Sequence, residues 1–403
     1  MYPRASPYQD WTTTMPIPDT PLSFATRVVN DYSASRPSEE YGAVIPPIYL
    51  ASTFAQPTDG TSPVYGYQRS GNPTRGAVES ALAYVEGARH CLAFATGMAA
   101  SATIFSSLHT NQRVLLTSSV YGGTFLFAQQ FFAARGISAD FVEDFNSLQT
   151  IPEDTGLIFL ETPTNPTLRV TDIAHVVQLA KQAGAKVVVD NTFSTSYIQD
   201  PLKEGVDAVV YSGTKYLAGH SDALAGFILT NDHTWYESLK IASKALGNPL
   251  SPFDSYSVIR GLKTLAIRLD RAQQNALELR KFLANHPAVE RVLAPGWFSE
   301  QEKEIHRRQS RGDGALFSFE LKKGINFFDF AAHLKLIRFA VSLGSVETLI
   351  CHPATMIHEN LTPAERAKAG ISDQLLRLAV GIEDVADLRA DLAGALSFVT
   401  PEK

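Results

Sequence analysis

Two residues that could perform covalent and proton-transfer chemistry follow neighbouring apolar runs of the sequence. Asp190 ends the run KVVVD, and Lys215 lies in the segment SGTK, directly after the run that ends at Tyr211. A lysine amine can form a Schiff base with an aldehyde, and an aspartate can keep a pyridine nitrogen protonated. The pair therefore suits pyridoxal 5'-phosphate (PLP), although each residue alone also fits a structural role, as a helix cap or a snorkelling surface lysine.

Glycine, hydroxyl and aromatic residues near other apolar runs could complete a PLP site. Gly97 and Met98 stand where a helix is expected to begin, and backbone amides at such a position bind phosphate well. The hydroxyls of Ser212 and Thr214 could donate to the same phosphate. Tyr121 could stack on the face of the ring. None of these residues decides the matter alone, but together they predict one cofactor site.

An alternation of strand and helix patterns predicts the scaffold that positions these residues. The run LIFLE at 157–161 is typical of a buried strand, a helical pattern follows at 171–184, and KVVVD at 186–190 is the next strand. These elements form a βαβ unit. Shorter apolar runs elsewhere extend the alternation, which predicts an α/β fold with a mostly parallel central sheet covered by helices. Ligands bind such sheets at the carboxyl ends of the strands.

Segments on either side of this sheet predict further elements. Asn72 and Pro73 are typical of a helix start, and Gly87 is typical of a helix end. The uncharged stretch 91–108 is rich in hydroxyls, so a buried strand, turn and helix are favoured over a membrane span.

The C-terminal part of the chain predicts a second domain. The segment 262–284 predicts a long helix leading to it, the run FSFEL at 317–321 predicts a strand, and an apolar stripe at 385–396 predicts the last helix.

Composition and charge exclude several classes of partner. The 403 residues carry a net charge of −6 without a basic block, so we expect no nucleic-acid or membrane partner. Residues 1–21 form a Pro- and Thr-rich arm without a signal-peptide pattern, and two cysteines are too few for a disulfide framework, so we expect a cytoplasmic protein. His352 and His358 lack the spacing of a zinc site, and we expect no metal.

Many ordered motifs of this sequence resemble one family, the trans-sulfuration or Cys/Met-metabolism group of fold-type-I PLP-dependent enzymes. The resemblance runs from about Phe24 to about Leu396 and includes GAVIPPIYLASTF, YQRSGNPTR, ATGMAA, VYGGT, ETPTNP, VVVDNTF, YSGTKYLAGHSD, SLGSVETL and LLRLAVGIED. It implies a PLP-dependent transferase fold with a smaller α+β C-terminal domain. The boundaries implied are an N-terminal arm over 1–70 that contacts a neighbouring subunit, a PLP-binding domain over 71–262 and a small domain over 263–403.

The resemblance also implies a role for each matching residue. Lys215 would form the Schiff base and shuttle protons, Asp190 would pair with the pyridine nitrogen, and Tyr121 would stack on the ring and take part in acid–base steps. The other cofactor-binding residues implied are Gly97, Met98, Ser212 and Thr214 at the phosphate, Asn165 near the phenolic oxygen, and Tyr67 and Arg69 at the phosphate of the neighbouring subunit. The substrate-binding residues implied are Arg377 at the α-carboxylate, Ser342 and Asn165 beside it, and Glu347 in the pocket.

Because Tyr67 and Arg69 would complete a neighbour's site, the resemblance implies a homotetramer built of dimers that share active sites. The substrate implied is a small amino acid.

Departures from the family pattern bear on the reaction. Members of this family expel a γ leaving group to give a vinylglycine-type intermediate, which either accepts a nucleophile or breaks down to a 2-oxo acid and ammonia. Gly123 stands where methionine γ-lyases have a cysteine, and Leu126 stands where many cystathionine enzymes have an arginine for the distal carboxylate. The segment WFSEQEKEIH replaces a His-Pro segment near the expected rim of the pocket, which suggests altered substrate entry.

We therefore predict γ-replacement on an O-acyl-L-homoserine by a sulfur or carbon nucleophile, as in relatives of cystathionine γ-synthase and O-acetylhomoserine sulfhydrylase. The alternative is a γ-lyase that acts on cystathionine or methionine.

Overall fold

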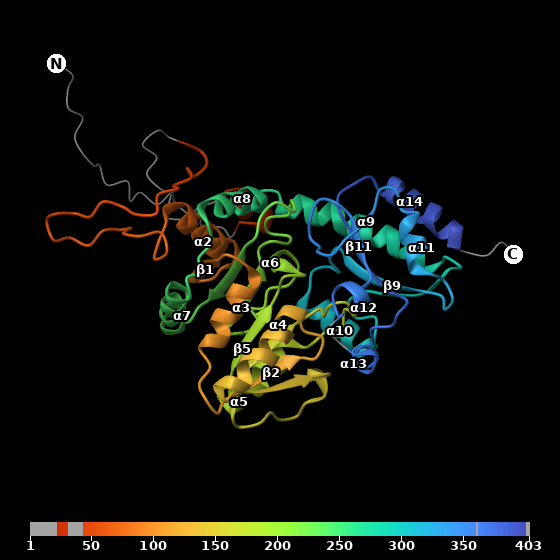
Figure 1. Ribbon diagram of the computed structural model, residues 1–403, viewed down its shortest axis with the longest axis horizontal. Helices are drawn as coiled ribbons and strands as arrows, with labels where there is room; N and C mark the ends of the chain where they lie inside the picture. The colour runs from red at the N-terminus through yellow and green to blue at the C-terminus, as the bar shows by residue number, and fades with distance from the viewer. Residues whose placement is uncertain (1–21, 31–42, 360–361, 400–403) are drawn as a thin grey trace, which may run out of the picture.

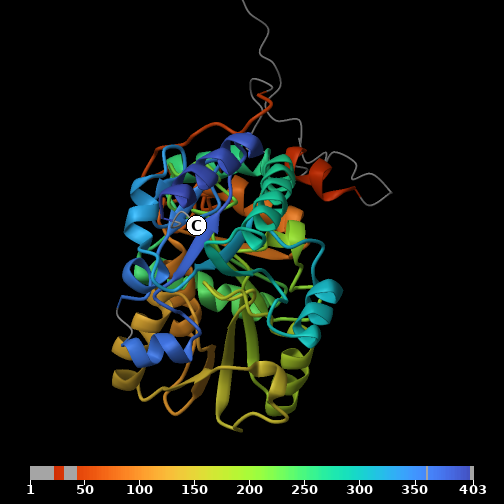
Figure 2. The ribbon, with the colours of Figure 1, turned by 90° about the vertical axis from the view of Figure 1, so that its right-hand side faces the viewer.

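The computed structural model describes residues 22–30, 43–359 and 362–399, so the predicted arm over 1–21 lies outside the described residues. The described residues form a large layered unit and a smaller one, joined along one side by a long helix (Figure 1). Seen from the side of the smaller unit, its sheet and helices lie in front of the larger one (Figure 2).

A sheet of seven strands forms the centre of the larger unit, in the order β1-β7-β6-β5-β4-β2-β3. The pairs from β3 through β6 are parallel, and β7 runs antiparallel to both of its neighbours, so the predicted mostly parallel sheet is confirmed. Its strands are β1 (His90–Phe94), β2 (Arg113–Thr117), β3 (Ser138–Val142), β4 (Thr155–Glu161), β5 (Lys186–Asp190), β6 (Ala208–Ser212) and β7 (Gly226–Thr230).

Helices cover both faces of this sheet because successive side chains of a buried strand point to opposite faces. In β5, Val188 belongs to the same apolar cluster as residues of α3 (Gly97–Ser106) and α7 (His233–Leu246). Val187 and Val189 belong to the cluster that contains residues of α2 (Pro73–Glu86), α5 (Ile173–Ala183) and α9 (Leu265–Ala284). The helical segments of this unit are α1 (Phe24–Val29), α2 (Pro73–Glu86), α3 (Gly97–Ser106), α4 (Gly122–Phe127), η1 (Ala128–Phe132), η2 (Ala133–Arg135), η3 (Phe145–Ser147), α5 (Ile173–Ala183), α6 (Thr195–Ile198), α7 (His233–Leu246) and α8 (Pro252–Leu262).

The predicted ends of α2 are confirmed in detail. The Asn72 side chain accepts hydrogen bonds from the amides of Thr74 and Arg75, Pro73 is the first helical residue, and Gly87 ends the helix in the left-handed conformation.

A second sheet, in the order β10-β11-β12-β9-β8, forms the smaller unit within the described residues. The predicted strand at 317–321 lies within β9, and the predicted last helix lies within α14. The elements of this unit are α9 (Leu265–Ala284), β8 (Val289–Leu293), α10 (Glu300–Gln309), β9 (Leu316–Leu321), α11 (Phe327–Ala332), β10 (Arg338–Phe339), β11 (Leu349–Cys351), α12 (Pro353–Met356), α13 (Pro363–Lys368), β12 (Leu375–Ala379) and α14 (Val385–Val399). None of the described helices is both long and apolar enough to span a membrane.

The single helix predicted over 262–284 is wrong at its start. The structure has two helices here, α8 and α9, separated at residues 263–264. The carbonyl of Gly261 accepts from the amide of Thr264 at 3.1 Å and from Nη2 of Arg268 at 2.8 Å, so a tight turn and a side chain satisfy it in place of a continuing helix. The break could not be read from apolar spacing, because both helices keep the same stripe.

Candidate active site

The carboxyl ends of three adjacent strands carry a group of polar residues that we call the strand-end cluster: Glu161, Asp190 and Ser212, with Tyr121 above Glu161. Glu161 at the end of β4 lies beside Asp190 at the end of β5 in the sheet register. The Thr192 amide donates to Asp190 Oδ1 at 3.0 Å, and the Thr192 hydroxyl accepts from the Ser212 amide at 2.8 Å. The structure therefore brings the predicted residues Asp190 and Ser212 together, with Glu161 beside them.

Two buried carboxyl groups give this cluster its electrostatic character. Burial raises the pKa of Asp190 to about 6, and hydrogen bonds from Thr192 oppose the rise. Burial raises the pKa of Glu161 well above its usual range, and the nearby Asp190 raises it further. Among the described residues no basic side chain pairs with either group. A cationic group placed here would relieve the cost of burying a carboxylate, so the cluster fits a protonated ring nitrogen.

The start of α3 lies against the end of β6, and we call this close approach the glycine cradle. A Cβ added at Gly97 would lie 2.9 Å from Cβ of Ser212, so only glycine lets the helix start approach the strand end this closely. Thr214 lies in the same loop, where its hydroxyl accepts from the Ala225 amide at 3.0 Å. The N-terminal amides of a ten-residue helix beside two hydroxyls suit a phosphate group.

The ring of Tyr121 lies beside this cradle. Its backbone amide donates to Glu161 Oε1 at 2.7 Å, and its side chain is 49% exposed. A Cβ added at Gly123 would lie 2.7 Å from the Tyr121 ring and 3.0 Å from Sδ of Met98. Tyr121, Met98 and Gly123 are therefore packed together, and the space at Gly123 is closed to a larger side chain unless the ring moves.

Lys215 points from the large unit toward the small one. Its Nζ donates to the Ser342 hydroxyl at 2.8 Å. Burial lowers the pKa of Lys215 to about 8, and the positive charge of Arg377 acts in the same direction. Ser342 has a φ of 87°, in a region that non-glycine residues rarely adopt, and such strain is typical of functional sites. The amine is therefore held in place, and it loses its proton more readily than an ordinary lysine does.

Arg377 on β12 forms the centre of a second group, the arginine cluster, with Asn165 and Ser342. Its Nη1 donates to Oδ1 of Asn165 at 3.0 Å, and its Nη2 donates to the Ser342 carbonyl at 2.8 Å. The residue is 2% exposed, and its Nε has no hydrogen-bond partner among the described residues. A buried, unneutralised guanidinium is costly, and an incoming carboxylate would both neutralise and bond it.

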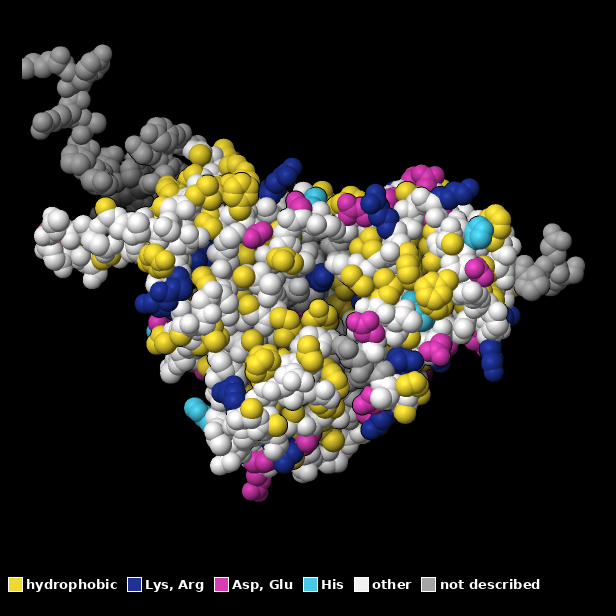
Figure 3. Space-filling view, viewed as in Figure 1, with side chains coloured by type: hydrophobic (Ala, Val, Ile, Leu, Met, Phe, Trp, Pro, Cys, Tyr) yellow, Lys and Arg dark blue, Asp and Glu magenta, His cyan; other side chains and the backbone are white. Residues whose placement is uncertain are grey.

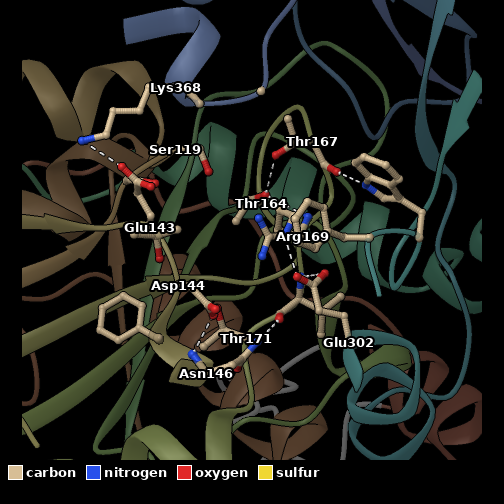
Figure 4. A pocket seen from close by; sticks show the side chains of 18 of the residues that line it. Ser119, Glu143, Asp144, Asn146, Thr164, Thr167, Arg169, Thr171, Glu302 and Lys368 are labelled. Carbon is tan, nitrogen blue, oxygen red and sulfur yellow. Dashed lines mark hydrogen bonds and ion pairs between the residues drawn. The ribbon is translucent and has the colours of Figure 1, made fainter. Parts of the chain in front are cut away.

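A pocket of about 300 Å³ lies along the loop at 162–171, where residues of the small unit contact this loop (Figure 4). Lys215, Arg377 and Asp190 do not line this pocket. Arg169 Nε lies 2.5 Å from Glu302 Oε1, while the Val170 amide donates to Glu302 Oε2 at 3.0 Å. Trp297 Nε1 donates to the Thr167 carbonyl at 2.7 Å. This loop also carries Asn165, so the small unit sets the position of a partner of Arg377.

Glu161 was not predicted as a site residue from the sequence. The hydrogen bonds of Trp297 and Glu302 to the loop at 162–171 were not predicted either. Glu161 had a usable signal, since it directly follows an apolar strand run next to that of Asp190. Trp297 and Glu302 belong to the WFSEQEKEIH segment, which was expected at the rim of the pocket. In the structure this segment packs against the loop at 162–171 and lines the pocket there.

Other predicted residues lie apart from both clusters. Arg69 donates to the Lys244 carbonyl at 3.0 Å, and its guanidinium lies 5.6 Å from the Tyr67 ring, without a contact to the strand-end cluster in the described residues. Glu347 is exposed, and its carboxylate lies 3.5 Å from the Ser221 hydroxyl.

Comparison with known proteins identifies the family. A family model described as "Cys/Met metabolism PLP-dependent enzyme" matches residues 25–397. The chain belongs to this family. It is 43% identical over 377 residues to cystathionine beta-lyase of Coxiella burnetii, covering 92% of this chain and 97% of that protein.

Solved structures agree with this assignment. Cystathionine gamma-lyase from Lactobacillus plantarum, complexed with L-serine, superposes with a TM-score of 0.89 at 38% identity, covering 94% of this chain and 99% of that one. Cystathionine gamma synthase from Xanthomonas oryzae gives a TM-score of 0.87 at 38% identity, covering 94% and 98%. The fold is that of fold-type-I PLP enzymes, and PLP is the cofactor of this family member. The buried carboxyls, the glycine cradle and the Lys215 amine fit that group.

Proposed function

We propose that this enzyme catalyses γ-replacement on an O-acyl-L-homoserine, with a sulfur or carbon nucleophile that lacks a distal carboxylate. The observation that carries this choice is Leu126. It lies on α4, which begins directly after Tyr121, and its side chain is 50% exposed. An apolar side chain there cannot bind a second carboxylate, which both cysteine as a nucleophile and cystathionine as a substrate would present.

The residues of the site support the required proton transfers. Bound PLP supplies an electron sink for negative charge that develops on the substrate. We assign to Lys215 the removal of the proton at Cα, because its amine is buried and its pKa is lowered to about 8. The amine holds one transferred proton at a time, so it releases this proton before it takes one from Cβ, and protons return to Cβ and Cα after the nucleophile has added. Departure of the acyloxy group breaks the Cγ–O bond, and the nucleophile forms the new bond at Cγ.

The same proposal gives Arg377 the substrate α-carboxylate, with Asn165 and Ser342 fixing the plane of its guanidinium. Asp190 pairs with the ring nitrogen, and Gly97, Met98, Ser212 and Thr214 bind the phosphate. Tyr121 covers the ring, and its amide hydrogen bond to Glu161 supports that placement.

A carbon–sulfur lyase is the second candidate, and the names of several relatives favour it. Cystathionine beta-lyase of Coxiella burnetii and cystathionine gamma-lyase of Lactobacillus plantarum both cleave rather than join. Methionine as the substrate is less favoured, because methionine γ-lyases are expected to have a cysteine where this chain has Gly123. A side chain at this position would collide with the Tyr121 ring and Met98.

The proposal includes a homotetramer of dimers with shared active sites. Apolar side chains gather over the N-terminal segment and around α3 and α4 on one face of the molecule (Figure 3). Val44, Leu50 and Val64 are each more than 60% exposed on the described part of that segment. A second subunit covering this face would bury them and would bring its own Tyr67 and Arg69 to a neighbour's phosphate site.

A product assay by mass spectrometry tests the proposed reaction. The PLP-loaded enzyme is incubated with O-acetyl- or O-succinyl-L-homoserine and, separately, with sulfide, methanethiol, cysteine or a carbon acid without a free carboxylate, such as a β-keto ester. We expect a new amino acid that carries sulfide, the thiol or the carbon acid, and little product from cysteine. Release of 2-oxobutanoate and ammonia with every partner would establish the lyase instead. A matched Leu126→Arg variant should gain activity with cysteine.

A further inference from the structure

A buried polar network lies beneath the strand-end cluster, on the opposite face of the sheet. Its centre is Tyr211, whose hydroxyl donates to Glu86 Oε2 at 2.6 Å and accepts from Asn191 Nδ2 at 3.0 Å. The Ser196 hydroxyl hydrogen-bonds Glu86 Oε1 at 2.5 Å. Tyr211 and Asn191 are completely buried, so each of these bonds replaces contact with water.

The network continues to the end of a third strand. Gln199 Nε2 donates to the Thr162 carbonyl at 2.9 Å and to Asn191 Oδ1 at 3.1 Å. Asn191 Nδ2 in turn donates to the Gln199 carbonyl at 2.9 Å. The polar groups that join β4, β5 and β6 on this face are therefore bonded to one another and to the backbone.

Each strand end contributes one network residue and one neighbour in the strand-end cluster. Asn191 follows Asp190, Tyr211 precedes Ser212, and Thr162 follows Glu161. Neighbouring residues of an extended chain point to opposite faces of a sheet. The network therefore bonds the ends of β4, β5 and β6 on one face, and the strand-end cluster lies on the other face. A shift of Tyr211 or Asn191 would displace Ser212 or Asp190 on the other face.

Glu86 is the residue that anchors this network outside the sheet. It is the last residue of α2, and a negative charge is unfavourable at the C-terminal end of a helix. Burial raises the pKa of Glu86 to about 7, the bonds from Ser196 and Tyr211 oppose the rise, Asp200 adds to it, and Arg27 opposes it. The hydroxyls of Ser196 and Tyr211 both donate to this carboxyl group, one to each oxygen.

We propose that Glu86, Tyr211 and Asn191 are positioning residues for PLP, which keep the ends of β5 and β6 at the spacing that lets Asp190 and Ser212 contact the cofactor together. The inference rests on the proposed cofactor roles of Asp190 and Ser212. None of the three network residues needs to touch the cofactor.

The variant Tyr211→Phe tests this proposal, because it removes one oxygen and with it one hydrogen bond of Glu86 and one of Asn191. PLP retention is measured by serial dilution of the holoenzyme, and cofactor absorbance is recorded as a function of pH. We expect about tenfold weaker PLP retention and a shifted midpoint in the pH titration. The matched control is Tyr216→Phe, since the Tyr216 hydroxyl is also buried but has no partner among the described residues. Equal retention and equal titrations in both variants would overturn the proposal.

Two further sets of variants keep the result interpretable. If Tyr211→Phe does not fold, Glu86→Gln and Glu86→Leu replace it: the amide oxygen still accepts from Tyr211 and its NH2 can donate to the Ser196 oxygen, so this variant should retain PLP, whereas leucine should not. Equal retention by those two variants would also contradict the inference. Ser212→Ala and Asp190→Asn report on the proposed site itself. If these two weaken PLP retention and the network variants do not, the network inference alone fails.

Discussion

The strand-end cluster and the arginine cluster differ in how their residues are brought together. Glu161, Asp190 and Ser212 end neighbouring strands of one sheet, so the register of that sheet brings them together and the network on its other face acts on the same layer. Arg377 lies on the second sheet and depends on Asn165 and Ser342, which come from two other parts of the chain. The cofactor side of the site is thus built within one rigid layer, and the substrate side is built at a junction.

Lys215 connects the two clusters, and its removal has the largest expected effect. The Lys215→Ala variant loses the only amine placed against Ser342 among the described residues and so loses the proposed base. We expect activity to fall by roughly 10³-fold or more. The visible absorbance of lysine-bound cofactor should also disappear.

Absorbance spectra and initial rates of wild type and Lys215→Ala check this prediction. Lys240→Ala is a suitable control, because Lys240 is an exposed lysine that pairs with Glu237 on the same helix. A Lys215→Ala protein that kept both the spectrum and the rate would show that another residue holds the cofactor.

Glu86, in the network beneath the strand-end cluster, predicts that the free energy of unfolding depends on pH. Burial raises the pKa of Glu86 from 4.5 to about 7, so the unfolded chain releases this proton first as the pH rises. Below 4.5, the pKa in the unfolded chain, the protonated carboxyl group makes its full contribution to the free energy of unfolding. This contribution, about 3 kcal/mol in total, is lost as the pH rises through about 7, the pKa in the folded protein.

Urea unfolding at about pH 5 and about pH 8 measures this difference. Glu86→Gln, which cannot ionise, should lack this contribution and unfold with a flatter pH dependence. The same pH dependence in wild type and Glu86→Gln would mean that Glu86 is not buried as described.

The arginine cluster, where the two units meet, gives a prediction about substrate binding rather than about the cofactor. Arg377→Lys keeps the charge but cannot bond Asn165, Ser342 and a carboxylate together. We expect KM for the amino-acid substrate to rise by about thirtyfold, or about 2 kcal/mol, with a smaller change in kcat. Arg389→Lys, on the far helix α14, is the control. An unchanged KM in Arg377→Lys would remove Arg377 from the carboxylate site.

The same comparison explains what the sequence could and could not predict. Asp190 directly follows an apolar strand run, so its place was predictable from local pattern and the rule for parallel sheets. Arg377 lies within the apolar strand β12, where nothing local marks a binding residue, and only family resemblance indicated it. The break between α8 and α9 depends on the side chain of Arg268 reaching back to Gly261, which apolar spacing does not reveal.

The contacts of Glu302 could not be predicted from the sequence for a similar reason. Glu302 lies on α10, more than a hundred residues from the loop that it holds, and its helix is strongly charged. A glutamate in such a helix predicts a solvated face. In the structure its side chain is only 3% exposed, because it pairs with Arg169.

The smallest expected effect comes from weakening the contact between Glu302 and the loop at 162–171. Glu302→Gln removes the charge that faces Arg169 but keeps an oxygen that can accept one bond, so the loop should loosen without unfolding. Because that loop carries Asn165, KM should rise by about fivefold, or about 1 kcal/mol, while the cofactor absorbance stays unchanged. Glu300→Gln is the matched control, since Glu300 lies on the same helix with its side chain 87% exposed. A change in cofactor absorbance without a change in KM would place the effect of Glu302 on the strand-end cluster, and the separation of the two clusters would no longer hold.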